Sequence, residues 1–328
     1  MGPEQPQLAA SFHGMSRRSV LKLAAAAALP VLSRPVTGAQ NEKKTSQSKV
    51  TGPIDAHVHV WTPDVTRYPL AEGGNPAEMK PASFTPEELF AQCKPVGVNR
   101  IVLIQMSFYK TDNRYMLDTI RKYPDNFRGV AIIDETRPDA ARTMQELKEA
   151  GVTGYRLYAN KAAVESWATA PEMNAMWAQA QKLNQAICLL SNPDALPGIQ
   201  VLCERHPQTR VVIDHFSRIG VSGKVEETDL ANLCRLADYP NVFVKTSAFY
   251  ALGKKKAPYT DLGPMIRQLR DTFGAQRLMW ASDCPFQVEN GHTYKASIDL
   301  IRDKLDFLTE EDKSWILEKT AEQVYWQV

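Results

Sequence analysis

The strongest constraint on the fold of this chain is a repeated alternation of short apolar runs with longer amphipathic stretches. The alternation begins near Pro53 and continues almost to the end of the chain. It is typical of successive strand and helix units whose strands form a parallel sheet. Eight candidate strands follow from it, at residues 54–60, 100–106, 127–133, 152–158, 186–191, 210–215, 241–247 and 277–282.

The stretches between these strands have the apolar periodicity of helices, among them residues 85–94, 111–123, 139–150, 171–183 and 261–273. The first has a clear start, because Thr85 is a good N-cap residue and Pro86 fits the first turn. A similar pattern beginning at Thr309 predicts one more helix near the C-terminus.

Eight strand and helix units in roughly 275 residues match the strand count and the size of a TIM barrel. The alternative, an open doubly wound sheet, would need a Gly-rich phosphate-binding loop after an early strand, and the sequence has none. We therefore predict an α/β fold: a single (β/α)8 TIM barrel over residues 53–328, with an extra C-terminal helix.

The N-terminal segment shows a different pattern. Ser16-Arg17-Arg18-Ser19-Val20-Leu21-Lys22 precedes an Ala-rich apolar stretch, residues 23–32, and Thr37-Gly38-Ala39 offers a small-residue cleavage site. This arrangement resembles a twin-arginine export signal. We expect residues 1–39 to be a removable signal peptide, with the twin-arginine translocation machinery as a partner during export, and a periplasmic or secreted mature protein.

A membrane anchor is the alternative for this segment. About ten apolar residues interrupted by Pro30 are too few, however, to cross a bilayer core that needs roughly 20. The polar residues 40–52 show no apolar periodicity and are predicted to be a tether. Met15, directly before the twin arginines, is as good a candidate for the true start as Met1.

Charge and cysteine content exclude several classes of protein. The 39 Lys and Arg residues against 37 Asp and Glu residues give a net charge of +2, with no block of like charge that would favour nucleic acid or a membrane surface as a partner. Five cysteines without a CxxC spacing do not make a disulfide scaffold. A small-molecule substrate is the expected partner.

Three of the five histidines in the mature chain fall at predicted strand ends. His57 and His59 end the first strand, and the period of two places them on one face. His215 ends the sixth strand, and Asp283 follows the eighth. Because TIM-barrel active sites form at the carboxyl ends of the strands, we predict that these four residues form a catalytic cluster. The alternative is a set of structural histidines inside the barrel.

These strand ends carry a resemblance to a known family. Asp55-Ala56-His57-Val58-His59-Val60-Trp61, Val212-Ile213-Asp214-His215 and Ala281-Ser282-Asp283-Cys284-Pro285 resemble the amidohydrolase superfamily, and more narrowly its amidohydrolase-2 branch. Gln105-Met106-Ser107-Phe108-Tyr109 and Gly154-Tyr155-Arg156-Leu157 are most similar to the 2-pyrone-4,6-dicarboxylate lactonases and sugar-lactone hydrolases of that branch. The resemblance runs from about Ile54 to Tyr325 and implies an enzyme that opens cyclic esters.

The resemblance leaves the cofactor open. Metal-dependent members bring a further histidine or a modified lysine from a middle strand, whereas the fifth strand here ends Leu190-Ser191-Asn192-Pro193. Three ligands and a water are sufficient for a catalytic zinc ion, so His57, His59 and Asp283 could hold one. Metal-free catalysis is the alternative. In both cases we expect Asp283 to take a proton from water and His215 to assist the leaving alkoxide.

Further polar residues near the strand ends are candidates for substrate binding. Arg156 with Tyr158 could clamp a carboxylate, and Lys245 could add a point charge. Gln105 and Ser107, placed at the end of the second strand, complete the set. A cationic mouth suits an acidic or sugar-derived lactone. The alternatives are a buried ion pair for Arg156 or Lys245, and ordinary hydrogen-bonding roles for Gln105 and Ser107.

Two other functions remain open from the sequence. One is metal-dependent decarboxylation or hydration by a member of the same superfamily, which would need a firmly bound metal. The other is a non-catalytic periplasmic binding protein, which would need the pocket but no general base. The sequence contains no arginine between the seventh strand and Arg267, and this argues against pyrone dicarboxylate itself, because the lactonases that open it carry additional arginines for its second carboxylate.

Overall fold

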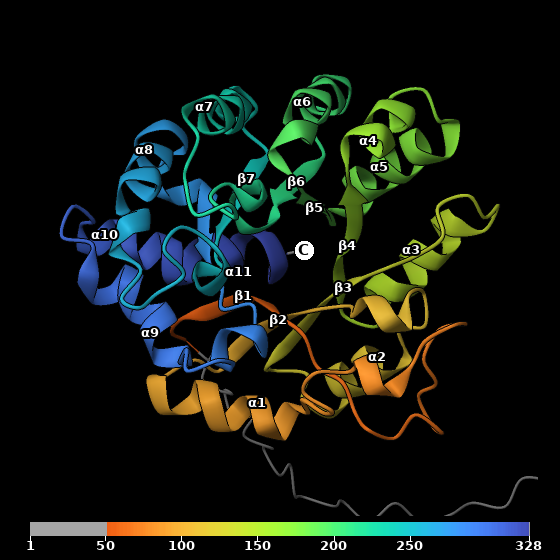
Figure 1. Ribbon diagram of the computed structural model, residues 1–328. Helices are drawn as coiled ribbons and strands as arrows, with labels where there is room; N and C mark the ends of the chain where they lie inside the picture. The colour runs from red at the N-terminus through yellow and green to blue at the C-terminus, as the bar shows by residue number, and fades with distance from the viewer. Residues whose placement is uncertain (1–50, 328) are drawn as a thin grey trace, which may run out of the picture. The chain divides into compact units, whose positions relative to one another are not determined.

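The computed structural model describes residues 51–327 of the chain. Eight parallel strands follow one another in chain order around one sheet (Figure 1). A bridge between Val58 and Cys284 joins the first strand to the end of the last, so the sheet closes into the predicted (β/α)8 barrel. The strands are β1 Ile54–Val58, β2 Arg100–Ile104, β3 Phe127–Ala131, β4 Val152–Ala159, β5 Ala186–Ser191, β6 Arg210–Ile213, β7 Val242–Thr246 and β8 Leu278–Trp280.

Helices surround the barrel, and each strand is followed by at least one of them (Figure 1). The N-cap predicted at Thr85 is confirmed: its hydroxyl accepts from the Glu88 amide, and the Glu88 carboxylate accepts from the Thr85 amide. The helices are α1 Pro86–Cys93, α2 Arg114–Lys122, α3 Ala140–Glu149, α4 Lys161–Trp167, α5 Pro171–Leu183, α6 Leu196–Arg205, α7 Glu227–Arg235, α8 Gly263–Phe273, α9 Tyr294–Asp299, α10 Glu310–Ser314 and α11 Thr320–Tyr325.

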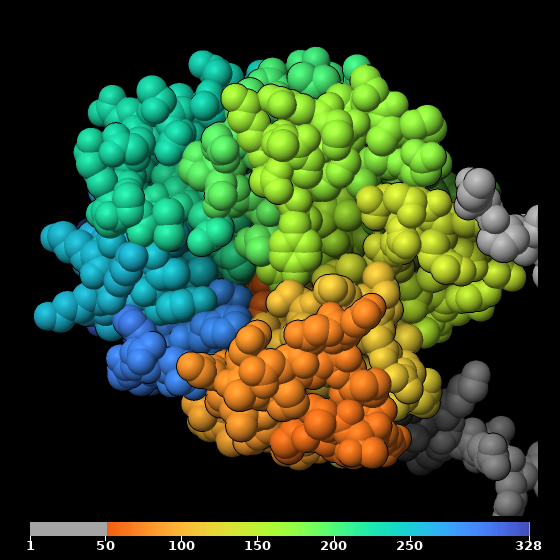
Figure 2. Space-filling view, turned by 45° about the vertical axis from the view of Figure 1, so that its right-hand side comes forward, coloured from red at the N-terminus to blue at the C-terminus, as the bar shows by residue number. Residues whose placement is uncertain are grey.

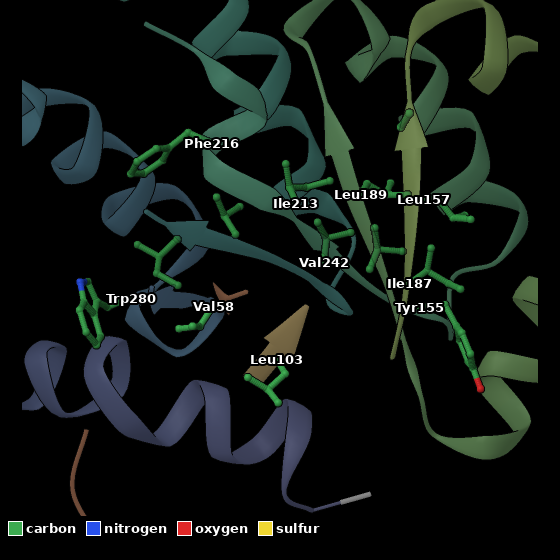
Figure 3. Packing of buried hydrophobic residues seen from close by; sticks show 14 of the residues in the cluster. Val58, Leu103, Tyr155, Leu157, Ile187, Leu189, Ile213, Phe216, Val242 and Trp280 are labelled. Carbon is green, nitrogen blue, oxygen red and sulfur yellow. The ribbon is translucent and has the colours of Figure 1, made fainter. Parts of the chain in front are cut away.

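Alternate residues of the strands face two different hydrophobic clusters. On β2, Val102 and Ile104 point into the barrel, whereas Leu103 packs outward beneath the helices (Figure 3). Trp280 of β8 belongs to the outer cluster as well. Both faces of the strands are therefore buried, which is why their sequences are continuous apolar runs and not alternating ones.

The C-terminal segment closes the N-terminal end of the barrel. A π-helix, Trp315–Lys319, links α10 to α11, and Ala321, Val324 and Tyr325 of α11 pack against the interior residues of the strands. The Tyr325 hydroxyl lies 3.5 Å from Cys188 Sγ of β5. The predicted extra C-terminal helix is thus present, and it serves as the floor of the barrel.

The predicted signal peptide, residues 1–39, and all but the last two residues of the predicted tether, 40–52, lie outside the described residues. Within residues 51–327, no helix is both long enough and apolar enough to cross a membrane.

Candidate active site

The end of β1 positions two histidines through a break in its pairing. The register between β1 and β2 shifts between Asp55 and Val58, and such a bulge changes which face successive side chains take. Asp55 consequently turns towards α9, where its Oδ2 accepts a 2.7 Å hydrogen bond from the Tyr294 hydroxyl. His57 and His59 share the opposite, interior face, with their Nε2 atoms 3.3 Å apart.

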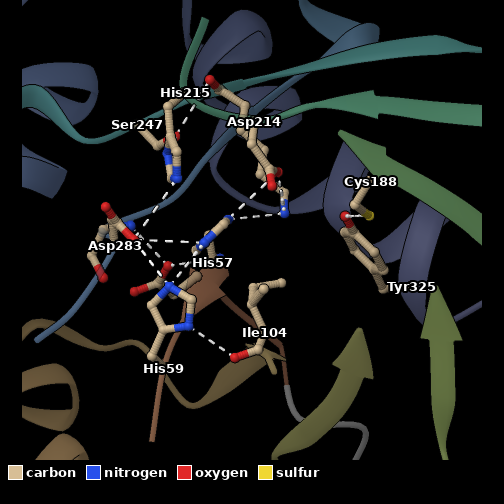
Figure 4. Close-up of polar contacts among 12 residues, drawn as sticks. His57, His59, Ile104, Cys188, Asp214, His215, Ser247, Asp283 and Tyr325 are labelled. Carbon is tan, nitrogen blue, oxygen red and sulfur yellow. Dashed lines mark hydrogen bonds and ion pairs between the residues drawn. The ribbon is translucent and has the colours of Figure 1, made fainter. Parts of the chain in front are cut away.

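The four residues predicted to form a cluster lie together at the carboxyl end of the barrel (Figure 4). Asp283 Oδ1 lies 3.6 Å from His57 Nε2, 3.5 Å from His59 Nε2 and 3.8 Å from His215 Nε2. All four side chains are buried. Groups separated by more than 200 residues of sequence therefore face one another across a space the size of one small atom or ion.

The backbone and one tyrosine fix the orientation of Asp283. Its amide donates to the His57 carbonyl at 2.9 Å, and its φ of +67° places it in the left-handed region. The hydroxyl of Tyr250, in the loop after β7, donates to Asp283 Oδ2 at 2.7 Å. Burial alone would raise the pKa of Asp283, but the imidazoles of His215, His59 and His57 hold it below its usual value. Asp283 is therefore a carboxylate whose Oδ1 faces the histidines.

His215 is presented by a strained turn. His215, Phe216, Ser217 and Arg218 all have φ between 52° and 59°, a left-handed run that costs roughly 1–2 kcal/mol per residue for L-amino acids. Such strain is concentrated at functional sites. The Nδ1 atom of His215 lies 2.7 Å from Ser247 Oγ, which leaves Nε2 facing Asp283. Burial lowers the pKa of His215, so its imidazole is neutral near pH 7.

A buried ion pair lies behind His57. Asp214 Oδ1 is 3.0 Å from Lys245 Nζ and 3.5 Å from His57 Nδ1, and Lys245 Nζ is 3.3 Å from the same Nδ1. None of the three side chains is exposed. Burial, followed by the charge of Lys245, lowers the pKa of His57 far below its usual value.

This placement corrects the substrate-binding role predicted for Lys245. Its ammonium faces Asp214 behind the histidine layer and does not reach the mouth of the barrel. Lys245 instead forms the buried ion pair that was the alternative prediction. The pairing is needed because an unpaired ammonium group in the interior would be far less stable than a paired one.

Sequence reasoning did not assign Asp214, Asp55 or Tyr250. Asp214 directly precedes His215, so its place at a strand end was a usable signal. Asp55 holds the first and last strands together, since its Oδ1 accepts from the Ser282 amide at 2.8 Å. Burial raises the pKa of Asp55 to about 6. Tyr250 lies in a short 3-10 helix, Phe249–Ala251, after β7, and no pattern in the sequence identifies it.

The donor atoms of His57, His59 and Asp283 fit a divalent metal ion. A tetrahedral ion with bonds of about 2.0–2.1 Å separates its ligands by about 3.3–3.4 Å, and the three contacts here measure 3.3, 3.5 and 3.6 Å. His59 Nδ1 lies 2.9 Å from the Ile104 carbonyl, an acceptor, so it carries the proton and its Nε2 is a lone pair. Lone pairs and a carboxylate at such short separations need a shared cation or proton.

Of the two substrate residues predicted on β4, Tyr158 is exposed at the rim and Arg156 is buried below it. Arg156 is 7% exposed, and its guanidinium carbon lies 5.2 Å from the centre of the Tyr158 ring, which is 44% exposed. Arg156 Nε is buried without a hydrogen-bond partner. Within residues 51–327 no carboxylate forms an ion pair with Arg156, so the alternative of a buried ion pair does not describe it.

The two residues predicted to bind substrate at the end of β2 have different positions in the structure. Gln105 is buried, and its amide donates to the Lys110 and Asp112 carbonyls at 3.1 and 2.8 Å, so it organises the following loop. Ser107 is not on the strand, which ends at Ile104; it begins a 3-10 helix and is exposed. Of this pair, Ser107 is the one that reaches a cavity.

That cavity is connected to the histidine cluster through Phe286. It has a volume of about 530 Å³ and is lined by the loops after β1 and β2 together with Phe286. The Phe286 ring lies 5.8 Å from that of His59. Figure 2 shows the orange residues that follow β1 beside the green residues that follow β4, with a hollow between them. None of the four cluster residues lines this cavity, but His215 and Asp283 keep 5% and 6% of their surface exposed.

A TIM barrel with buried histidines and a carboxylate at the carboxyl ends of its strands defines the class of barrel enzymes that activate water. Residues 54–326 match the family model described as amidohydrolase, and the chain belongs to the amidohydrolase family. The resemblance stated from the strand-end residues is confirmed. The protein is an enzyme of the amidohydrolase type.

Curated relatives cover most of the barrel. An L-fucono-1,5-lactonase of Burkholderia ambifaria is 29% identical over 247 residues, 73% of this chain and 82% of that protein. A 2-pyrone-4,6-dicarboxylate hydrolase of Comamonas testosteroni is 27% identical over 254 residues, 75% of this chain and 80% of that one. A crystal structure of a Burkholderia multivorans amidohydrolase with bound zinc has a TM-score of 0.71 at 20% identity, covering 84% of this chain and 99% of that chain; this likeness supports the fold.

Proposed function

We propose that the protein hydrolyses the lactone of an acidic or sugar-derived compound. The observation that carries the proposal is the position of Asp283 Oδ1, which lies 3.5 to 3.8 Å from three imidazole nitrogens at the open end of the barrel. The names of the two curated relatives, which both describe hydrolases of cyclic esters, support the same reaction class.

The residues divide the reaction between them. Asp283 accepts a proton from the attacking water, because its carboxylate is ionised and faces the pocket. His215 Nε2, 3.8 Å away, carries a proton to the leaving alkoxide. Arg156, buried below Tyr158 on β4, binds a carboxylate or hydroxyl groups of the substrate, since its guanidinium has no carboxylate partner among the described residues.

His57, His59 and Asp283 would hold a divalent metal ion, and zinc is the ion we propose, because neutral imidazoles and a carboxylate are a suitable donor set for it. Such an ion, when bound, lowers the pKa of water and polarises a carbonyl oxygen. The Asp214 and Lys245 pair contacts Nδ1 of His57 and keeps its ring oriented with Nε2 towards the site.

A lactone panel tests the reaction. The wild-type protein is expected to release acid from aldonolactones, measured by a pH indicator, and Asp283→Asn is expected to lower kcat by about 10²- to 10⁴-fold. Asp306→Asn, at an exposed aspartate beside Arg267 and Phe307 on the outer surface, is the control and should leave the rate unchanged. Retained turnover in Asp283→Asn contradicts the assignment, and a wild type that binds lactones without turnover favours a binding protein.

Metal content tests the cofactor separately. Protein purified without added ions or chelator is expected to contain one equivalent of zinc by mass spectrometry, and His59→Ala is expected to lose it. Chelation should abolish turnover and zinc should restore it. Full activity in chelated, metal-free protein contradicts the zinc proposal and supports the metal-free route.

We also propose that the protein is exported and acts in the periplasm or outside the cell. The sequence pattern of residues 16–39 supports this proposal. Replacing both Arg17 and Arg18 by Lys is expected to retain the full-length precursor in the cytoplasm on cell fractionation. Equal export of the double variant would contradict the twin-arginine assignment.

A further inference from the structure

A second cavity lies at the N-terminal end of the barrel, opposite the histidine cluster. Its volume is about 540 Å³, within the range of small-molecule sites, roughly 300–1,000 Å³. The ends of α2 and α3, the starts of β3 and β4, and the residue after α11 form its walls. They are Leu117, Ile120, Arg121, Pro124, Arg128, Lys148, Glu149, Ala150, Gly151, Thr153 and Trp326.

Positive charge predominates in this cavity. Arg121, Arg128 and Lys148 line it with a single carboxylate, Glu149. Arg121 is already paired with Asp118 at 2.5 Å. Within residues 51–327, however, neither Arg128 nor Lys148 forms an ion pair. Among the described residues, these two positive charges therefore have no direct ion-pair partner, although the charge of Asp125 acts on Arg128 from nearby.

Backbone carbonyls hold both of these cations in place. Arg128 Nη1 donates to the Pro124 and Phe127 carbonyls, each at 2.8 Å, and Lys148 Nζ donates to the Leu183 carbonyl at 2.8 Å. These bonds fix the positions of the side chains but do not neutralise them. Partial burial lowers the pKa of Arg128, and the nearby charge of Asp125 opposes this shift.

Two further features of the cavity suit an organic anion. The guanidinium carbons of Arg128 and Arg100 lie over the partly exposed Trp326 ring, 5.2 and 5.8 Å from its centre, so cations and aromatic surface meet at the wall of the cavity. Thr153 is 3% exposed, and its Oγ1 has no hydrogen-bond partner. A buried hydroxyl without a partner is unfavourable, and a bound acceptor would satisfy it.

We propose that this cavity binds a small carboxylate with a planar apolar body, such as an aromatic acid. The carboxylate pairs with Arg128 and Lys148 and accepts from the Thr153 hydroxyl, and the planar body packs on Trp326. The site is separate from the catalytic pocket, because α11 and the barrel interior lie between them.

Calorimetric titration of the full-length protein with benzoate tests the proposal, with uncharged benzamide as the matched probe. Benzoate is expected to bind saturably and benzamide at least about tenfold more weakly, since a charge-assisted hydrogen bond is lost. Arg128→Gln should weaken benzoate binding by about tenfold or more. Arg142→Gln, an exposed arginine of α3, should leave it unchanged.

Arg156→Gln separates this cavity from the catalytic pocket and should also leave benzoate affinity unchanged. If Arg156→Gln abolishes binding while Arg128→Gln does not, the anion binds at the catalytic site and the proposal is wrong. Absence of saturable binding, or equal affinity for benzamide, overturns it as well. Lys148→Met provides a second variant should Arg128→Gln fail to fold, and the melting temperature of each variant is measured first.

Discussion

The two ends of the barrel are built from the same eight strands but have opposite chemical character. At the N-terminal end, Val102, Phe243 and Val324 belong to one apolar cluster. At the carboxyl end, Lys245, two residues beyond Phe243 on the same strand, joins Asp214 and the histidines in a buried charged network. On β7, therefore, Phe243 contributes to apolar packing, and Lys245, two residues further along, contributes to the charged network of the site.

The difference also shows in the backbone. A run of four left-handed residues, His215 to Arg218, lies at the carboxyl end together with Asp283, whereas the floor of the barrel is formed by the π-helix Trp315–Lys319 and α11. The apolar floor, together with the pairing of Arg100 with Glu318 at 2.6 Å, supplies stability that offsets the strain and the buried charges above it. We expect substitutions at the two ends to affect different measurements.

The largest expected effect on stability comes from the floor. Tyr325→Ala leaves a cavity beneath the strands and should lower the free energy of unfolding by about 4 kcal/mol, measured by urea denaturation. The kcat of the folded variant should fall only slightly, because Tyr325 reaches the catalytic residues only through Lys245, whose Nζ lies 5.7 Å from the centre of its ring. Tyr158→Ala, at the exposed rim, is the control: it should alter KM and leave stability nearly as it is. The reverse pattern would contradict the division between the ends.

The next effect comes from the buried charges. Lys245→Met leaves Asp214 without its counter-charge and should cost about 3 kcal/mol of stability. Adding Asp214→Leu removes the unpaired charge, so the double variant should recover most of that loss. The double variant is also expected to be less active than wild type, since His57 loses both groups that contact its Nδ1. If Lys245→Met were as stable as wild type, breaking the ion pair would have no effect on stability and the prediction would be wrong.

A smaller effect is expected from Tyr250, which orients the catalytic carboxylate. Tyr250→Phe removes the hydrogen bond to Asp283 Oδ2 and should lower kcat by about tenfold, equivalent to about 1.4 kcal/mol, with little change in KM or melting temperature. Tyr239→Phe is a matched control, because the Tyr239 hydroxyl donates to Glu204 at 2.8 Å on the outer surface. Equal kinetics in the two variants would remove Tyr250 from the site.

The smallest effect is expected outside both ends. Glu87 on α1 accepts from Lys122 and from Tyr123, which lower its pKa from 4.5 to about 2. Its side chain is 54% exposed, so Glu87→Gln should cost only about 0.5 kcal/mol at pH 7. Because the pKa is lowered on folding, this contribution is complete above about pH 4.5 and disappears as the pH falls towards 2. A difference between wild type and variant that grows on acidification would contradict the assignment.

Local sequence pattern was sufficient for the barrel and for the core of the site. Three features depend only on residues that are close in sequence: the apolar runs, the cap at Thr85 and the period of two at His57 and His59. They can therefore be predicted without knowing the tertiary structure. The rule that barrel chemistry lies at the carboxyl ends of strands then brought His215 and Asp283 to the same place.

Tertiary structure decided the partners of those residues. Strict alternation would place Asp55 on the same face as His57, but the bulge in β1 turns it towards Tyr294. Lys245 was expected in the mouth, and strand register places it against Asp214 instead. The sequence specifies which face of a strand a side chain occupies; which distant group it meets depends on how the strands are staggered and how the loops between them close, and no local pattern contains that information.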